Sequence, residues 1–217
     1  MYKRQNLWHA STIGICVNHS YERRVGLWCA GIDKDGILFC NQSFSDYPKK
    51  IPDGKFNPMD IKPEWMLLSY KAKVLVSTVF ENYFPEYAVD ESIKTCWCST
   101  TNSSNEWLKI DLGKEQNISA VQINFADVRI SKMNLAPKSY KGTLSLERYI
   151  DTSYLNKTQW KLLGSKDDEE WEIIEDKSDA DTDLCHDFVV FDESKLYRFL
   201  KLEFISCPYN QRFAVSG

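Results

Sequence analysis

The stretch from residue 106 to residue 125 is EWLKIDLGKEQNISAVQINF, and it decides the fold class. Apolar and polar residues alternate from position 108 to position 112, up to a glycine at position 113. A second alternating run covers positions 118–125. Because successive side chains of a strand point to opposite faces, this period of two is typical of half-buried strands. We therefore predict two strands here, the first of which ends at Gly113.

Strand patterns also cover the C-terminal third of the chain. The further runs are Trp160–Leu163, Trp171–Ile174, Phe188–Phe191 and Arg198–Ile205. In the last run, Leu200, Leu202 and Phe204 are expected to face one way, while Lys201 and Glu203 face the other. No segment carries a 3.6-residue apolar stripe over three turns. These patterns predict an all-β sandwich of jelly-roll type.

The N-terminal quarter shows a smaller set of strand signals. Three apolar runs lie at Ile13–Val17, Val25–Ala30 and Ile37–Cys40, and Asp35-Gly36 is a hairpin-turn signal between the last two. A three-stranded meander is marginal in water by itself, so we expect it to be one blade or edge of a larger sheet. Residues 47–65 hold four of the seven prolines and are predicted to be a connector.

Composition narrows the classes of function. The 217 residues are 43% hydrophobic and 13% aromatic, which permits a folded core. The net charge of −4 argues against nucleic-acid binding, because phosphates are repelled. No apolar run is long enough for a membrane span, and no signal-peptide pattern opens the sequence. The seven cysteines are an odd number without a repeated spacing, which favours reduced core thiols.

Motifs of catalysis are absent. The sequence has no phosphate-binding glycine loop, no HExxH and no GxSxG. Cys185 and His186 are neighbours, but adjacent strand residues point to opposite faces and cannot act as nucleophile and base. The acidic segment 166–183 lacks the ligand spacing of an EF-hand, which favours a solvated loop and an edge strand.

Residues 88–127 carry an ordered set of motifs. The set is Ala88, Asp90, Thr95, Trp97, Glu106-Trp107-Leu108 and Asp111-Leu112-Gly113. With the Trp160–Trp171 segment and Arg198–Phe204, it resembles the coagulation factor 5/8 type C family, also called discoidin domains. The resemblance implies a discoidin-type jelly-roll β-sandwich over residues 72–217. That family places one more strand after the element at 213–217, so we expect the last strand to be missing.

The N-terminal part carries a second resemblance. Its motifs are Trp8–Thr12, Glu22–Gly26, Asp35–Asn41, Asp46–Pro48 and Trp65–Lys71. They resemble the last blade of a family 43 glycoside hydrolase propeller, which has five blades. The resemblance implies a β-propeller blade remnant over residues 1–56, with 1–5 as a non-native leader, and a linker over 57–71. The missing blades would be partners and would carry the catalytic carboxylates, so this fragment is expected to be inactive and its parent an O-glycosyl hydrolase.

Two metal sites are implied by these resemblances. The discoidin relatives that bind carbohydrate hold calcium in a loop whose Asp and Thr correspond to Asp90 and Thr95, and hard oxygen ligands suit calcium. A turn-capping role explains Asp90 equally well. The propeller resemblance places His9 where a histidine helps to hold a metal ion. The alternative for His9 is a strand histidine bonded to the backbone.

The discoidin resemblance also implies a sugar-binding surface in the loops at one end of the sandwich. Aromatic faces stack on sugar C–H groups, and polar side chains bond the hydroxyls. The candidate residues are Asn82, Tyr83, Phe84, Tyr87, Tyr209, Asn210 and Arg212. Four tryptophans beside strand patterns are expected in the core, namely Trp97, Trp107, Trp160 and Trp171.

Three functions remain open from the sequence. The first is a carbohydrate-binding module in a truncated family 43-like glycoside hydrolase that acts on plant-type polysaccharides. The second is a discoidin-type adhesion or lipid- or protein-binding domain, against which the acidic charge argues because membrane binders carry a basic collar. The third is structural packing for the propeller. An extracellular or cell-surface location is favoured by the family, while the cysteine content leaves a cytoplasmic one open.

Overall fold

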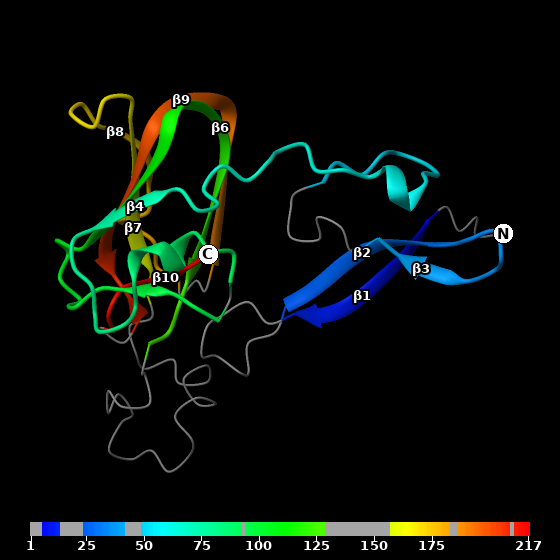
Figure 1. Ribbon diagram of the computed structural model, residues 1–217, viewed down its shortest axis with the longest axis horizontal. Helices are drawn as coiled ribbons and strands as arrows, with labels where there is room; N and C mark the ends of the chain where they lie inside the picture. The colour runs from blue at the N-terminus through cyan, green and yellow to red at the C-terminus, as the bar shows by residue number, and fades with distance from the viewer. Residues whose placement is uncertain are drawn as a thin grey trace, which may run out of the picture. The chain divides into compact units, whose positions relative to one another are not determined.

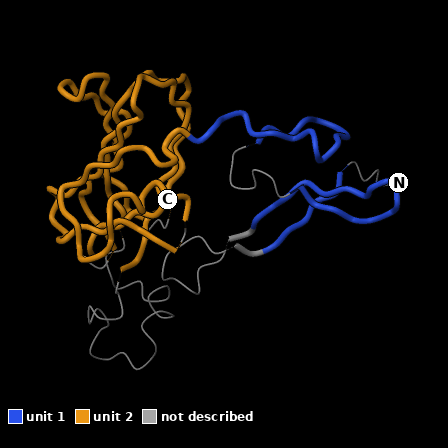
Figure 2. Tube along the Cα trace, viewed as in Figure 1, with its two compact units in different colours: residues 1–14, 23–67 blue, residues 15–22, 68–217 orange. Residues whose placement is uncertain are grey.

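The computed structural model describes residues 6–13, 24–41, 49–92, 94–128, 157–182, 186–208 and 211–217. They form two compact units, which Figure 2 distinguishes by colour. The smaller unit comprises the described residues up to Leu67 and the larger unit those from Leu68 onward. Residues 57–67 of the expected linker thus lie within the smaller unit. No helix in these described ranges is long and apolar enough to cross a membrane.

The smaller unit contains an antiparallel sheet in the order β1-β2-β3. Its strands are β1 Leu7–Ile13, β2 Arg24–Ile32 and β3 Leu38–Cys40. The turn predicted at Asp35-Gly36 is present between β2 and β3, with Gly36 at φ +80°. The first strand was predicted at Ile13–Val17; β1 covers Leu7–Ile13, and residues 14–17 lie outside the described residues. An exposed strand needs no apolar run, and residues 8–11 of β1 are all exposed.

The proline-rich segment packs on this small sheet. The Asn41 side chain donates a hydrogen bond to the Pro58 carbonyl at 2.9 Å, beside the 3₁₀ turn η1 (Pro58–Asp60). Asn6 binds the same segment twice, donating to the Gly54 carbonyl at 2.7 Å and accepting from the Phe56 amide at 3.2 Å. Residues 49–72 contain no strand, which agrees with the fixed φ of proline and its missing amide donor.

The larger unit is built of antiparallel strands and the short 3₁₀ turn η2 (Figure 1). Its elements are β4 Lys73–Val76, η2 Pro85–Ala88, β5 Trp97–Cys98, β6 Trp107–Phe125, β7 Gln159–Ser165, β8 Glu172–Asp176, β9 His186–Ser206 and β10 Ala214–Ser216. The hydrogen-bonded order is β5-β10-β6-β9-β7-β8, and β4 pairs with β6. The short strands β4, β5 and β10 escaped the sequence patterns.

The two long strands β6 and β9 supply both layers of the sandwich, and Figure 1 shows them following one arch. The first half of β6 pairs with β4 and the end of β9, while its second half pairs with β10 and the start of β9. Register shifts separate Asp111 from Gln116 and Ile118 from Ala120. Gly113, at φ +79°, was predicted to end a strand. That expectation was wrong, because its left-handed backbone fits an irregularity inside β6 that bends the strand instead.

The core lies between these layers. The side chains of Trp97, Trp160, Phe204 and Phe213 are almost completely buried in one apolar cluster. Leu200 and Leu202 join it, as the alternation predicted. On the opposite face of β9, Lys201 and Glu203 form an ion pair at 2.6 Å. The predicted all-β jelly-roll sandwich is confirmed.

Candidate functional site

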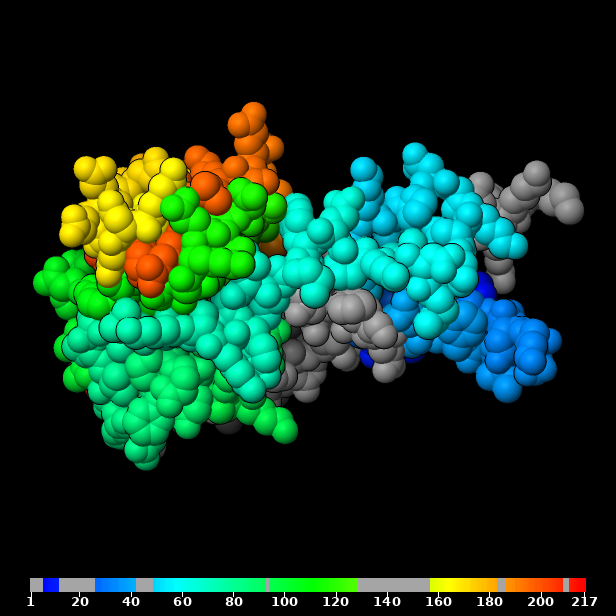
Figure 3. All heavy atoms as spheres, turned by 45° about the horizontal axis from the view of Figure 1, so that its top comes forward, coloured from blue at the N-terminus to red at the C-terminus, as the bar shows by residue number. Residues whose placement is uncertain are grey.

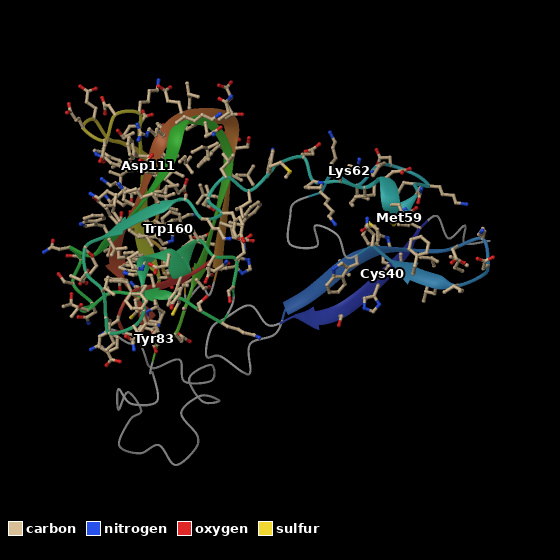
Figure 4. The ribbon with its side chains drawn as sticks, viewed as in Figure 1. Cys40, Met59, Lys62, Tyr83, Asp111 and Trp160 are labelled. Atoms are coloured by element: carbon tan, nitrogen blue, oxygen red, sulfur yellow. The ribbon has the colours of Figure 1, made fainter. Side chains whose placement is uncertain are left out.

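The loop between β4 and η2 holds three of the seven sequence-predicted sugar-binding residues, Asn82, Tyr83 and Phe84, and η2 holds a fourth, Tyr87. The loop is fixed to β5 by two backbone hydrogen bonds, from the Phe80 amide to the Cys98 carbonyl at 2.9 Å and from the Cys98 amide to the Tyr83 carbonyl at 3.4 Å. Glu81 has φ +50°, a conformation that turns the chain sharply between the two aromatic residues. This anchorage places the loop at one end of the sandwich, and Figure 4 shows Tyr83 at the end opposite Asp111, with Trp160 between them.

An aromatic stack joins this loop to the segment before β10. The rings of Phe80 and Tyr83 stack with centroids 6.0 Å apart and planes 12° apart. The Arg212 guanidinium lies over the Phe80 ring, 4.1 Å from its centroid, and its Nε donates to the Thr100 carbonyl at 3.0 Å. Phe80 therefore brings Tyr83 and Arg212 together. Sequence reasoning missed Phe80, although it belongs to the same aromatic run, 80–87, as the residues chosen.

The remaining predicted residues of the loop differ in exposure. Asn82 is exposed, Phe84 is 40% exposed, and Tyr87 is half-buried. The rings of Phe84 and Tyr87 meet edge to face at 5.8 Å. Tyr209 and Asn210 lie outside the described residues. The arrangement offers aromatic faces beside amide and guanidinium donors, which is the chemistry that a sugar ring requires.

A buried carboxylate holds the base of this end of the sandwich. Glu106 is only 3% exposed. One of its oxygens accepts hydrogen bonds from the hydroxyls of Ser77 and Thr78, the latter at 2.8 Å. The other accepts from the Thr101 hydroxyl at 2.6 Å and from the Thr101 amide at 3.2 Å. Burial raises the pKa of the Glu106 carboxyl, but these hydrogen bonds outweigh burial, so its pKa lies below the ordinary value.

The position of Glu106 explains part of the Glu-Trp-Leu motif. Its carboxylate connects the residues just after β4, which lead into the aromatic loop, with the loop after β5. A second residue of the same region, Trp97, donates its indole N–H to the Thr78 carbonyl at 2.9 Å. Charge-assisted hydrogen bonds in a dry environment are strong, so Glu106 fixes the backbone on which the aromatic residues stand.

Asp90 and Thr95 lie together in one loop. The Asp90 carboxylate accepts hydrogen bonds from the Thr95 hydroxyl at 2.7 Å and from the Ser92 amide at 2.9 Å, which is the turn-capping geometry. Burial raises the pKa of the neighbouring Cys96 thiol to about 12, so this sulfur stays protonated. Across the ranges that the structure describes, no three His, Cys, Asp or Glu side chains converge as metal ligands. Calcium at Asp90 and Thr95 stays a prediction.

His9 belongs to the smaller unit. It lies on β1 directly opposite Trp28 of β2, and the two rings are 5.5 Å apart. The side chain is exposed, and a metal role for it stays a prediction. Among the cysteines, Cys29, Cys40 and Cys96 carry free thiols, as predicted, whereas Cys16 and Cys185 lie outside the described residues.

The four tryptophans expected in the core divide into two pairs. Trp97 and Trp160 are 0% exposed, as predicted. Trp107 and Trp171 are only half-buried and line a pocket on the outer face of the sheet, so the expectation for them was wrong. Strand alternation explains the difference for Trp107, because it precedes the buried Leu108 and points to the opposite face.

The Asp-Leu-Gly motif has a structural role. Arg198 of β9 binds both oxygens of Asp111 on β6, at 2.8 and 2.9 Å, and the Gly113 amide donates to Asp111 at 2.8 Å. The Arg198 hydrogen bonds hold the pKa of the Asp111 carboxyl below its ordinary value. This motif pins the bend of β6 to β9 at the end opposite the aromatic loop.

The comparisons with known proteins agree with this geometry. Residues 87–193 match the factor 5/8 type C family model described as NedA-like, galactose-binding domain. The larger unit has a discoidin-type jelly-roll fold. A family 32 carbohydrate-binding module produced by Clostridium perfringens (CpGH89CBM32-4) has the same fold, with a TM-score of 0.50 and 10% identity over 70% of this chain and 96% of that chain. No curated protein matches the sequence significantly.

Two other solved structures are similar at lower scores. Chitosan-binding module 2 of a chitosanase/glucanase from Paenibacillus sp. IK-5, in complex with chitotriose, has a TM-score of 0.49 and 16% identity, covering 69% of this chain and 95% of that chain. A protein described as a glycoside hydrolase has a TM-score of 0.47 and 14% identity, covering 97% of this chain and 42% of that chain. At these identities the likeness concerns the fold alone.

The range that the family model matches covers only some of the candidate site residues. It includes Asp90, Thr95 and Glu106. Four residues of the aromatic stack and its surroundings lie outside the matched range, namely Phe80, Tyr83, Phe84 and Arg212. Any sugar-binding role of those residues therefore depends on their geometry in this chain.

Proposed function

We propose that the larger unit is a carbohydrate-binding module that binds sugar on the loop surface formed by Tyr83, Phe84, Tyr87 and Arg212. The observation that supports this function is the stack of Arg212, Phe80 and Tyr83, which holds aromatic faces and a guanidinium on one surface. Its fold is shared with the family 32 module named above. Aromatic rings present apolar faces to sugar C–H groups, while Asn82 and Arg212 can bond hydroxyls.

The expected affinity is weak. A shallow surface that meets one or two sugar rings makes few contacts, so we expect a Kd on the order of 0.1–1 mM. Titration of the full chain with arabinan, xylan and galactan oligosaccharides, followed by NMR, should move the signals of residues 80–87. Plant-type glycans come first because the family 43 resemblance implies such substrates.

Variants locate the site. Phe84→Ala should weaken binding about tenfold by removing an exposed ring, and Arg212→Ala should weaken it by releasing the stack on Phe80. The matched control is Phe188→Ala, since Phe188 is 41% exposed and belongs to the strand β9 rather than to the loop. Equal losses in Phe84→Ala and Phe188→Ala would contradict the site. Binding to anionic lipid vesicles without binding to any glycan would support the adhesion function instead.

We propose calcium binding at Asp90 and Thr95 as part of the same module. The two oxygens already lie in one loop, 2.7 Å apart, and hard oxygen ligands suit this ion. Calcium should raise the thermal midpoint of the full chain, and Asp90→Asn should abolish that increase. If Asp90→Asn lowers the midpoint equally with and without calcium, Asp90 only caps its turn.

We also propose that the smaller unit is the last blade of a family 43-like propeller, in a longer glycoside hydrolase that acts on plant-type polysaccharides. Its antiparallel sheet supports this, together with apolar side chains that further blades would cover: Leu27, Ile32, Ile37 and Leu38 are each more than 60% exposed. Coding sequence upstream should contain four further blades with three carboxylates. The chain alone should not hydrolyse aryl arabinosides or xylosides, since both catalytic carboxylates would lie in those blades.

A further inference from the structure

A pocket of about 290 Å³ lies on the outer face of the sheet in the larger unit. Trp107 and Lys109 come from β6, Lys201 from β9, and Asp168 and Trp171 from the hairpin between β7 and β8. In Figure 3 this hairpin, in yellow, lies against the green of β6 and the orange of β9. The hairpin lies at the end of the domain opposite Tyr83 (Figures 1 and 4), so the pocket is separate from the loop surface.

Two indole rings form the apolar walls. The Lys201 ammonium lies 5.6 Å from the centroid of Trp107 and 5.8 Å from that of Trp171. The Trp171 indole N–H donates to the Asp168 carbonyl at 3.3 Å, which fixes the orientation of this ring. The Trp171 ring is therefore held in place without being buried, and Trp107 is likewise only half-buried. Aromatic surface that is held in place but left open to solvent is available to an amphipathic ligand.

The polar groups of the pocket form balanced pairs. Lys109 and Lys201 are direct cross-strand neighbours, an unfavourable pair of like charges. Lys109 binds both oxygens of Asp168, at 2.6 and 2.7 Å, and Lys201 binds Glu203 at 2.6 Å. Asp168 makes its contact from a left-handed backbone, at φ +70°. Such a conformation is unfavourable for a residue with a Cβ, and residues held in it cluster at functional sites.

The surroundings select against anions. The hairpin also carries Asp167, Glu169 and Glu170 against one further ammonium, that of Lys166, so carboxylates outnumber the ammonium groups around the pocket. A uronate or a phosphate would be repelled, whereas neutral hydroxyls can accept from the ammonium groups and donate to the carboxylates. The volume lies at the lower limit of small-molecule pockets, which begin at about 300 Å³. One ring rather than a long chain fits this space.

We infer that this pocket is a second carbohydrate site, which takes one neutral sugar ring against Trp107 and Trp171, with Lys109 and Asp168 bonding its hydroxyls. The Lys201 ammonium moves aside on its flexible stem as the ring enters and keeps its pairing with Glu203. This site is independent of the loop surface, so the domain would contact a polysaccharide at two separated places. Two weak sites on one chain raise the apparent affinity for a long glycan.

The test uses the indole N–H signals of the full chain in NMR spectra. The signals of Trp107 and Trp171 are assigned with Trp107→Phe and Trp171→Phe. Xylotetraose, arabinotetraose, galactotetraose and cellotetraose are the neutral probes, and trigalacturonate is the acidic probe. At least one neutral probe should shift both signals saturably, while the signals of the buried Trp97 and Trp160 stay in place. Trigalacturonate should leave all four unchanged.

Variants separate this site from the loop surface. Trp171→Ala should weaken the binding reported by Trp107 about tenfold, the loss of one stacking face. Trp8→Ala, which removes an exposed indole of the smaller unit, is the matched control and should change nothing. Phe84→Ala should leave the shifts of Trp107 and Trp171 intact. The inference is overturned if no neutral probe moves these signals, if trigalacturonate binds there more tightly, or if Phe84→Ala abolishes the shifts.

Discussion

The two aromatic surfaces of the larger unit are built in different ways. At the loop end, Phe80, Tyr83 and Arg212 depend on long loops that are tied together by the buried carboxylate of Glu106. On the sheet face, Trp107 takes its position from the register of β6 against β9. A loop surface therefore needs a buried polar group that fixes its backbone, whereas a surface on strands is positioned by the hydrogen bonds between those strands. Changes that remove the anchor or disturb the ladder should therefore affect one surface and spare the other.

The largest effect is expected from Glu106→Ala. This change removes the buried carboxylate that accepts from the hydroxyls of Ser77, Thr78 and Thr101, and we expect a loss of about 3 kcal/mol in the free energy of unfolding. Urea unfolding measures this loss, with Glu169→Ala as the control at an exposed glutamate. Glycan shifts of residues 80–87 should weaken at the same time, while the indole signals of Trp107 and Trp171 persist. Loss of the glycan-induced shifts at residues 80–87 and at the two indoles together would mean that the two surfaces do not bind glycan independently.

Gly164→Ala should produce the opposite pattern. A Cβ on Gly164 of β7 would lie 2.7 Å from the Ile174 side chain and 2.8 Å from the Tyr197 ring, which is buried beneath the hairpin. Overpacking of this kind costs about 1–3 kcal/mol. Thermal unfolding measures the loss. We expect displaced indole signals of Trp171 and an unchanged loop surface. Gly113→Ala, at a position with open space but φ +79°, separates backbone strain from steric overlap.

The smallest effect concerns pH. The folded-state pKa of Glu106 lies below its unfolded value, which is about 4.3. Its contribution to stability is therefore complete above the unfolded pKa and is lost as pH falls through the folded pKa. The stability difference between the wild type and Glu106→Gln should be constant from about pH 7 to pH 5 and should shrink below that. Urea midpoints across this range measure it. A difference that stays constant down to about pH 3 would contradict this role of the ionised carboxylate.

Much of the fold was predictable, because alternation is a direct record of burial. Leu200, Leu202 and Phe204 lie in the core, and Lys201 and Glu203 lie outside it, as the pattern indicated. The continuity of β6 was not predictable, since a bulge and a strand end share the same glycine signal. The continuity of β9 was hidden because the polar residues 192–195 interrupt its apolar pattern. The short strands β5 and β10 were missed because two or three residues cannot show a period.

The candidate sites were predictable only in part. The loop aromatics stand out by composition, but the role of Phe80 depends on a contact with Arg212, which is 132 positions away in the sequence. The sheet-face pocket was hidden for a different reason. Trp107 and Trp171 lie beside strand patterns, and residue type alone cannot tell which face of a sheet is covered. Counting the alternation from Leu108 would have assigned Trp107 to the outside.

The shared strands of the two layers also constrain the folding kinetics. Ile110 pairs with Leu200 and Asn124 with His186, so every rung between β6 and β9 closes a loop of at least 62 residues. The chain must lose loop-closure entropy before any of these strand pairings contributes stabilising contacts. Such topologies are therefore slow to fold. The two layers share β6 and β9, so we expect them to form together. The larger unit should consequently refold in a single slow phase, and stopped-flow fluorescence would report the buried tryptophans of both layers with the same rate constant.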